Sequence, residues 1–148
     1  MKRFHIHLSV QDLDKNIQFY SRLFNAEPTV VKEDYAKWAL DDPLVNFAIS
    51  NRTSKPGLDH VGIQTDSDEE LAGLRHQLES AGISGFAQEN TTCCYTRSDK
   101  YWVQDPQGIA WETFHSLESV PVFSDTQANA DSGACCAPSL SKAGSSCC

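Results

Sequence analysis

The stretch "HIHLSVQDLDKNIQFYSRLF" (residues 5–24) joins two patterns that belong to different secondary structures. Its first residues alternate between apolar and polar side chains behind His5, which predicts a short β-strand. Asp12 follows and suits the N-cap of a helix. Apolar residues then recur at helical spacing, which predicts an amphipathic helix with one buried stripe: Leu13, Ile17, Tyr20 and Phe24.

The same succession returns in "HVGIQTDSDEELAGLRHQLESAG" (residues 60–82). His60 leads the second alternating segment, and the Asp-rich cluster at 66–68 supplies candidate N-caps. A second helical stripe follows, and Gly82 is placed to end the helix: Leu71, Leu74, Leu78 and Ala81. The chain therefore contains two copies of one strand-helix unit.

The segments after the two predicted helices also match each other. "KWALDDPLVNFAIS" (37–50) and "YWVQDPQGIAWETFHS" (101–116) each contain a Trp, then Asp-Pro, then an alternating strand. Asp-Pro favours a turn and does not fit a central strand, so each segment predicts a β-hairpin. Each half therefore reads β-α-β-β-β.

These patterns predict an α+β fold built from two βαβββ modules. The first module covers residues 3–50, a linker covers 51–57, and the second module covers 58–115, so the folded domain spans 1–115. Two similar modules in so short a chain should pack against each other. The cleft that they share is the expected functional site.

The composition changes near residue 116. Residues 116–148 are rich in Ser, Ala, Gly and Cys and carry no periodic apolar stripe. Such a segment buries too little apolar surface to offset the entropy of ordering it. We expect a flexible tail in which only "VPVF" (120–123) can dock on the domain.

Charge and cysteine content restrict the function. The net charge of −8 and the pI near 4.9 argue against a nucleic-acid partner. No apolar run long enough for a bilayer and no export signal is evident, which predicts a cytoplasmic protein without a membrane partner. All six cysteines stand in adjacent pairs, at 93–94, 135–136 and 147–148. In a reducing compartment these thiols are expected to bind metal or take part in catalysis.

Three residues of the two modules form a candidate metal site. His5 and His60 lead the two opening strands, and Glu112 lies on the last strand. Two imidazoles and one carboxylate make a facial triad that leaves coordination positions open. His7 shares a strand face with His5, so a register shift of one step along that face would exchange the two histidines.

Several of these motifs resemble one known family. "HIHLSVQDLDKNIQFYSRLFNAEP" resembles the opening of the vicinal-oxygen-chelate superfamily, which includes glyoxalase, bleomycin-resistance and extradiol dioxygenase proteins. "LDHVGIQT" and "DPQGIAWETF" resemble its later metal-ligand segments. The resemblance covers residues 3–115 and implies that His5, His60 and Glu112 are the metal ligands.

The segment "ENTTCCYTRSDKYWVQDPQG" (89–108) narrows the resemblance to arsenic-inducible carbon–arsenic lyases and their cadmium-induced relatives. This resemblance implies an Fe(II)-dependent dioxygenase that uses dioxygen to cleave trivalent organoarsenicals such as methylarsenite or aromatic arsenicals. Arsenite is the expected product. Cys93 and Cys94 are the implied catalytic and substrate-binding residues. Mn, Co, Ni or Zn can occupy the same ligand set.

The thiol pair suits arsenic chemistry. Two thiolates can fill both exchangeable positions of a monoalkyl arsenite and so fix the substrate. We expect residues 88–100 to form a mobile loop that closes over it. Arg97 and Lys100 are candidates for lowering the pKa of the thiols. The tail pairs either deliver metalloid to the site or are dispensable.

Alternatives from other classes remain open. One is a resistance protein that binds Cd, Zn or As(III) through its thiols without lyase activity. Another is a different metal-dependent isomerase or transferase of the same superfamily. Phe47 is the expected counterpart of Glu112 in the first module, and it cannot bind metal, so the site has three protein ligands. A glyoxalase-type isomerase usually needs a fourth protein ligand, and the three-ligand site therefore favours the oxygenase. Superfamily transferases also use three ligands. Both a monomer and a homodimer fit the sequence.

Overall fold

The computed structural model describes residues 1–122, so the cysteine pairs at 135–136 and 147–148 lie outside the described residues. The first module contains β1 (Arg3–Ser9), α1 (Leu13–Phe24), β2 (Val30–Lys32), β3 (Tyr35–Asp41) and β4 (Leu44–Ser50). The second contains β5 (Gly57–Thr65), α2 (Asp68–Ser80), β6 (Phe86–Cys93), β7 (Thr96–Gln104) and β8 (Ala110–Ser119). The predicted βαβββ pattern of an α+β fold is confirmed.

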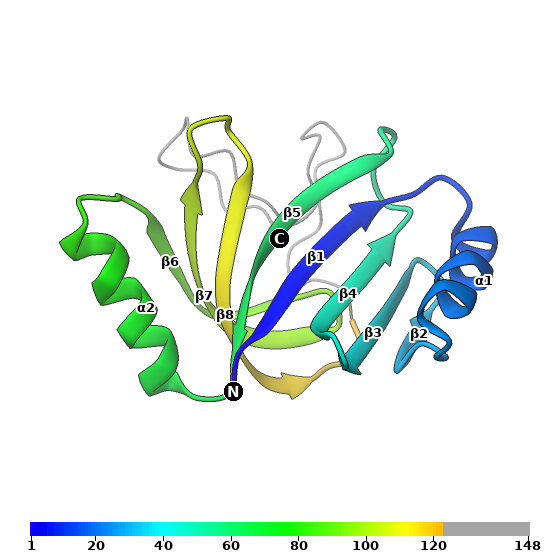
Figure 1. Cartoon of the computed structure of the whole chain (residues 1–148), viewed down its shortest axis with the longest axis horizontal. Coiled ribbons are helices and arrows are strands. Elements are labelled where there is room, and N and C mark those ends of the chain that lie inside the picture. Colours follow the sequence, from blue (N-terminus) through cyan, green and yellow to red (C-terminus); the bar gives the residue numbers. More distant parts are fainter. Residues whose placement is uncertain (123–148) are drawn as a thin grey trace.

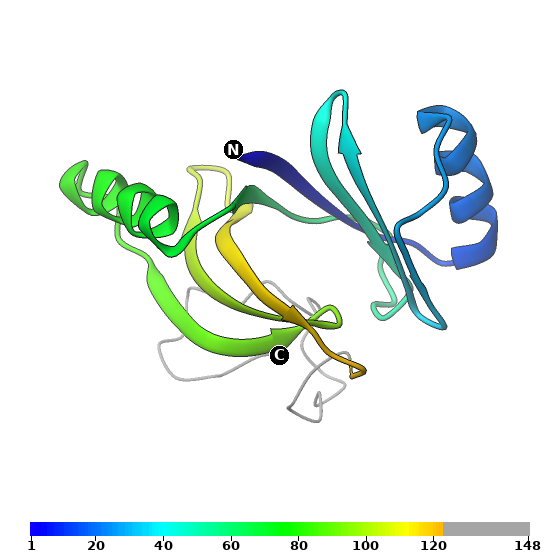
Figure 2. The same ribbon diagram turned by 90° about the horizontal axis from the view of Figure 1, so that it is seen from below.

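The strands form one curled sheet in the order β2-β3-β4-β1-β5-β8-β7-β6. Each module contributes four strands in the same relative order, with β1 parallel to β4 and β5 parallel to β8. The modules join where β1 pairs antiparallel with β5. Figure 1 shows the helices on the two outer sides of the sheet, and Figure 2 shows the concave side that the modules share.

The helix ends use the signals that the sequence carries. Asp12 caps α1, because its Oδ1 accepts a hydrogen bond from the Lys15 amide at 3.0 Å. Ser67, in the Asp-rich cluster, caps α2 by accepting from the Glu70 amide at 3.2 Å. Gly82 follows α2 with a φ of 73°, the left-handed conformation in which glycine is unstrained.

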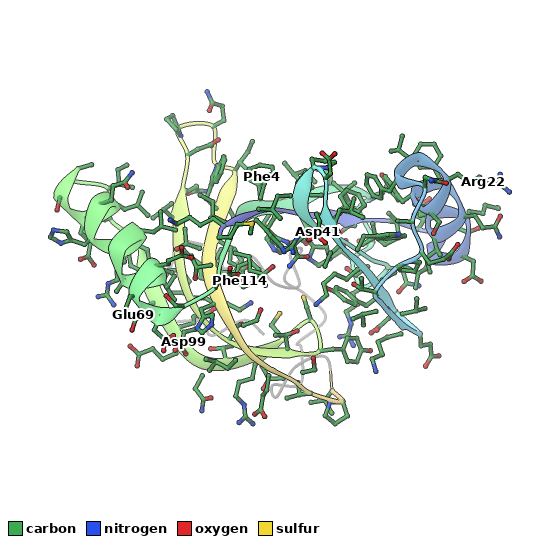
Figure 3. All side chains as sticks on the ribbon, turned by 60° about the horizontal axis from the view of Figure 1, so that its bottom comes forward. Phe4, Arg22, Asp41, Glu69, Asp99 and Phe114 are labelled. Atoms are coloured by element: carbon green, nitrogen blue, oxygen red, sulfur yellow. The ribbon has the colours of Figure 1, made fainter. Side chains whose placement is uncertain are left out.

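The hydrophobic core of the first module lies between the sheet and α1. Trp38 and Ile49 are fully buried there, together with Phe47 and Leu13. The partly buried side chains of α1 pack onto this cluster, whereas α2 has no fully buried residue. The labelled Arg22 and Glu69 lie on the two helices at the outside of the molecule in Figure 3.

Two expectations about the second module are wrong. Residues 88–100 are not a long loop, because β6 and β7 form a hairpin joined by Cys94 and Tyr95 alone. Polar residues occupy these strands because the hairpin is solvated on one side. In addition, β8 does not end at residue 115 but continues to Ser119, because Ser116 to Ser119 pair with β7.

Among the described residues, no helix is long and apolar enough to cross a membrane.

Candidate metal centre and thiol pair

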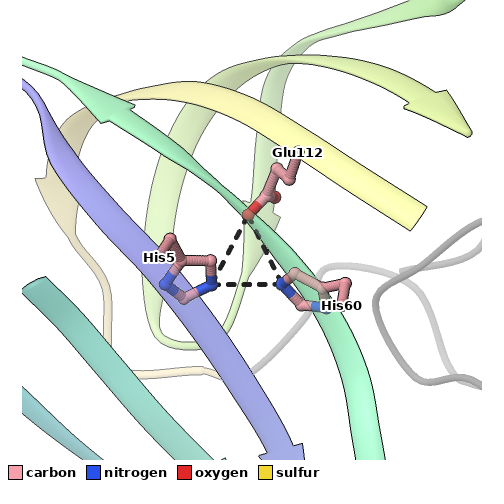
Figure 4. Close-up of side chains that lie close together, drawn as sticks. All are labelled: His5, His60 and Glu112. Carbon is pink, nitrogen blue, oxygen red and sulfur yellow. Dashed lines mark hydrogen bonds and ion pairs between the residues drawn. The ribbon is translucent and has the colours of Figure 1, made fainter. Parts of the chain in front are cut away.

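The structure brings His5, His60 and Glu112 together from three adjacent strands (Figure 4). The two Nε2 atoms are 3.1 Å apart, and Glu112 Oε2 lies 3.7 Å from that of His5 and 3.5 Å from that of His60. All three side chains are almost completely buried. The cluster joins the modules, because His5 belongs to the first and the other two residues belong to the second.

A small divalent cation fits this triangle. A point equidistant from the three ligand atoms lies about 2.0 Å from each, which is near the bond length that imidazole nitrogen and carboxylate oxygen make with such metals. Among the His, Cys, Asp and Glu side chains of residues 1–122, no fourth one joins this group of three. The donor set of two imidazoles and one carboxylate leaves coordination positions open.

Neighbouring groups fix which nitrogen of each imidazole faces the triangle. The Nδ1 of His5 lies 3.0 Å from the backbone carbonyl of Asn46, and the Nδ1 of His60 lies 2.6 Å from the carboxylate of Asp59. With Nδ1–H donating outward, both Nε2 lone pairs point to the centre. The sequence motifs did not indicate Asp59, although its position next to His60 is a signal that could have identified it.

A buried lysine balances the carboxylate of the cluster. Lys100 Nζ lies 2.6 Å from Glu112 Oε1, and the other carboxylate oxygen faces the two imidazoles. Lys100 also lines the cavity that contains both thiols, so its predicted effect on their pKa stays a prediction beside this ion pair. Arg97 is not placed as predicted, because it pairs with Glu118 at the surface with 2.7 Å between Nη1 and Oε1.

Burial and charge shift the pKa values of the cluster in different directions. Burial and the neighbouring His60 lower the pKa of His5 to about 3. Burial alone would lower the pKa of His60, but hydrogen bonds to Asp59 and Glu112 raise it to about 9. Burial would raise the pKa of Glu112, but Lys100 and His60 hold it below its usual range. The carboxylates of Asp59 and Glu112 thus favour a positive charge at His60, and a metal cation at Nε2 would supply this charge in place of a proton.

Cys93 and Cys94 lie at the tip of the β6–β7 hairpin and face the same cavity. Their sulfur atoms are 3.6 Å apart, Cys93 is buried, and no disulfide joins them. Cys94 and Tyr95 adopt left-handed backbone conformations, with φ of 56° and 60°. Two such residues in succession give the tight turn that matches the twist of a hairpin.

One cavity, lined by the metal cluster and by both thiols, connects the two groups. Its lining also includes His7, whose Nε2 is hydrogen-bonded to Ser50 Oγ at 3.0 Å, and Lys37. Burial and the nearby His60 lower the pKa of His7 to about 4. His7 is thus not part of the His5–His60–Glu112 triangle, although it shares the cavity with it and with the thiols.

The counterpart of Glu112 in the first module is not Phe47. Glu112 pairs with Gly62, which lies two residues beyond His60. The equivalent position in the first module is His7, two residues beyond His5, and His7 pairs with Ala48. Phe47 points to the other face of the sheet and packs under α1. Alanine binds no metal, so the conclusion that the first module adds no carboxylate is unchanged.

His115, Tyr101 and Tyr95 make their contacts outside the metal cluster. His115 faces α2, with its Nδ1 2.7 Å from Asp68 Oδ1, and so lies on the face of β8 opposite to Glu112. Tyr101 is buried beneath the guanidinium group of Arg75, and Tyr95 donates its hydroxyl to Asp34. Both tyrosines thus pack against other parts of the domain.

The fold and the site define a metal-dependent protein class, and comparison with known proteins gives the same class. Residues 2–113 match the Glyoxalase/Bleomycin resistance protein/Dioxygenase superfamily, and the chain belongs to this family. A solved structure of homoprotocatechuate 2,3-dioxygenase from Arthrobacter globiformis shares the fold, with a TM-score of 0.59 and 18% identity over 78% of this chain and 36% of that one.

Among curated relatives, the chain is 41% identical over 160 residues to the trivalent organoarsenical cleaving enzyme of Bacillus sp. (strain MD1). That match covers 100% of this chain and 99% of the relative. The chain is also 36% identical over 124 residues to the cadmium-induced protein CadI of Mycobacterium bovis, which covers 83% of this chain and 82% of the relative. The family resemblance seen in the sequence motifs is confirmed.

Proposed function

We propose that this protein cleaves the carbon–arsenic bond of trivalent organoarsenicals and releases arsenite. The observation that carries the proposal is one cavity that holds both a two-histidine-one-carboxylate cluster and a pair of adjacent thiols. The relative from Bacillus sp., named for organoarsenical cleavage and matched over the full chain, supports the same activity.

The thiols bind the substrate in this proposal. A monoalkyl arsenite offers two exchangeable hydroxyl groups, and Cys93 and Cys94 replace both, with the loss of two water molecules. The sulfur atoms already lie 3.6 Å apart, so little backbone motion is needed to reach one arsenic atom. Anchoring at two points leaves the organic substituent as the remaining group on arsenic and holds it inside the cavity.

His5, His60 and Glu112 hold the metal, which we take to be Fe(II). Bound there, divalent iron would supply the activation of dioxygen that carbon–arsenic cleavage requires, and Mn, Co, Ni or Zn would fit the same ligands. Asp59 and the carbonyl of Asn46 orient the imidazoles, and Lys100 holds the carboxylate. The burial of all these groups excludes water from the reacting bond.

A second candidate function is sequestration of soft metal or metalloid ions by the thiol pair. The relative named as a cadmium-induced protein favours this alternative. A sequestering protein would bind an organoarsenical through Cys93 and Cys94 and leave its carbon–arsenic bond intact. The two functions therefore differ in the arsenic species that leaves the protein.

Oxygen-dependent arsenite release separates the two functions. Protein loaded with Fe(II) is mixed with methylarsenite under anaerobic conditions, and arsenic species are separated by chromatography before and after air is admitted. We expect arsenite only after air, loss of about 95% or more of the rate in Cys93→Ser and Glu112→Gln, and an unchanged rate in His115→Gln, a histidine on the opposite face of β8. Methylarsenite that stays bound and unchanged in air would favour sequestration.

A further inference from the structure

One cation in the cavity has no role in the proposed function so far. Lys37 lies on β3, half-buried, and lines the cavity together with Cys94. In the sheet it pairs with Ala48, and Ala48 and Tyr35 pack against Cys93, with Cys94 and Tyr95 next to them. Lys37 therefore belongs to the first module but faces the thiols of the second.

The other cations near the hairpin are paired with different groups. Lys100 is bound to Glu112, Arg97 to Glu118 and Arg52 to Asp34. Lys32 lies over the ring of Tyr95, with 5.3 Å between Nζ and the ring centre. Among these cations, Lys37 is therefore the one from the first module that faces Cys94 in the cavity.

No carboxylate of residues 1–122 forms an ion pair with Lys37. Burial lowers the pKa of its ammonium group, and the opposing influence that raises it comes from Cys94. Other titratable groups also face the thiol pair: His7 and Asp59 both interact with the Cys93 sulfur, and Tyr35 and Tyr95 pack beside the two cysteines. A buried ammonium without a carboxylate partner is favoured only where another anion approaches it.

We propose that Lys37 is a positioning residue that stabilises the thiolate of Cys94 and makes Cys94 the first thiol to bond to arsenic. This inference rests on the proposed use of the thiol pair. The Cys94 thiolate attacks arsenic in R–As(OH)₂ and displaces hydroxide. That hydroxide takes the proton of the Cys93 thiol and becomes water. The Cys93 thiolate displaces the second hydroxide, which takes a proton from solvent. Arsenic stays trivalent, so no oxidant or reductant takes part.

The charge of Lys37 has a different effect after this exchange. Once the Cys94 sulfur is bonded to arsenic, it no longer carries a full negative charge, and the ammonium loses the anion that it faced. The attraction is therefore largest in the free protein and acts on the capture of the arsenical. A substitution at Lys37 should slow capture more than it slows the later cleavage step.

Alkylation of a single thiol tests the proposal without using lyase activity. In the full chain, Cys93 and the four cysteines at 135–136 and 147–148 are changed to serine, so that Cys94 is the one remaining thiol. Its rate of reaction with iodoacetamide is measured from about pH 5 to about pH 10 in this background, and again with Lys37→Gln, Lys37→Arg and Lys32→Gln added. Circular dichroism and the Tm show that each variant is folded.

We expect Lys37→Gln to raise the midpoint of the pH profile by about one unit and to slow alkylation at neutral pH about tenfold. Lys37→Arg should restore most of the rate, and Lys32→Gln should leave the midpoint unchanged. An unchanged midpoint in a folded Lys37→Gln variant would overturn the proposal, as would an equal shift in Lys32→Gln. Because the profile needs neither metal nor oxygen, its outcome is separate from that of the arsenite-release experiment.

Discussion

Replacing Asp59 by asparagine should weaken metal binding to the His5–His60–Glu112 cluster without unfolding the protein. The Asp59 carboxylate accepts a hydrogen bond from Nδ1 of His60 at 2.6 Å, and its side chain is 3% exposed. A short bond of this kind to an ionised acceptor is about twice as strong as a neutral one. It also increases the electron density that the opposite ring nitrogen offers to a metal.

The size of the effect follows from the two kinds of hydrogen bond. A bond to a charged group contributes about 1.5–3 kcal/mol and a neutral one about 1 kcal/mol, so the Asp59→Asn substitution would cost about 0.5–2 kcal/mol of metal binding. That cost corresponds to a loss of about 2–30-fold in affinity. The side chain is buried, so solvent does not reduce this figure. An asparagine side chain that turned its NH₂ group toward His60 would place the imidazole proton on Nε2 and weaken binding further.

Competition with a coloured chelator measures this loss with Co(II) as the probe metal. The matched control is Asp68→Asn, because Asp68 also pairs with a histidine Nδ1, at 2.7 Å, but is 69% exposed and lies on the other face of the sheet. We expect a Kd that rises about tenfold for Asp59→Asn and stays unchanged for Asp68→Asn. A folded Asp59→Asn protein with a Kd within about twofold of the unmodified chain would refute the role of this carboxylate.

Three further changes test the architecture around the site. Gly62→Ala places a Cβ 2.0 Å from a backbone carbonyl oxygen of β8, so we expect the free energy of unfolding to fall by about 1–3 kcal/mol. Gly73→Ala is the control, because a Cβ there meets nothing within 4 Å and should not lower the free energy of unfolding. Tyr95→Phe removes the 2.5 Å hydrogen bond to Asp34, and amide exchange in the hairpin turn should become about tenfold faster; an unchanged exchange rate would contradict this anchoring. Asp12→Ala should lower the Tm by about 2–4 °C at neutral pH. A backbone amide of α1 holds the pKa of Asp12 below 3.8, so this stabilisation is present above that value and is lost as the pH falls through the lower folded pKa. A Tm difference that persisted at about pH 2 would contradict it.

The repeated architecture could be predicted because local signals mark the ends of its elements. Asp12 and Gly82 mark helix ends, and the Asp-Pro pairs at 42–43 and 105–106 mark turns between strands. These signals act within a few residues and need no tertiary structure. Because the two modules share them, the sequence also indicated how the candidate metal ligands meet at the central strands.

The β6–β7 hairpin could not be predicted in the same way. Cys94 and Tyr95 both take left-handed conformations, which Asn and Gly favour and which neither of these side chains favours. Tertiary contacts stabilise the turn instead, among them the hydrogen bond from Tyr95 to Asp34 of the first module. The sequence of the turn alone therefore resembles an open loop.

The faces of β3 and β4 were also ambiguous from sequence. Trp38 and Phe47 pack under α1, whereas Lys37 lines the cavity and Ala48, its partner in the sheet, packs against Cys93. Both faces of these strands are covered, so the usual alternation between apolar and polar residues does not identify the side that carries the site. For this reason the sequence placed Phe47 where the structure places Ala48, and it gave Lys37 no role.

The left-handed turn at Cys94 and Tyr95 has a consequence for engineering this protein. Replacing Cys94 by asparagine would relieve the backbone at φ 56° and keep the hydrogen bond from Tyr95 to Asp34, so this substitution is expected to make the chain more stable. A screen that selects variants for heat resistance alone would thus favour the loss of one of the two thiols. Variants of this protein that are selected for thermal stability should therefore also be selected for binding of the arsenical.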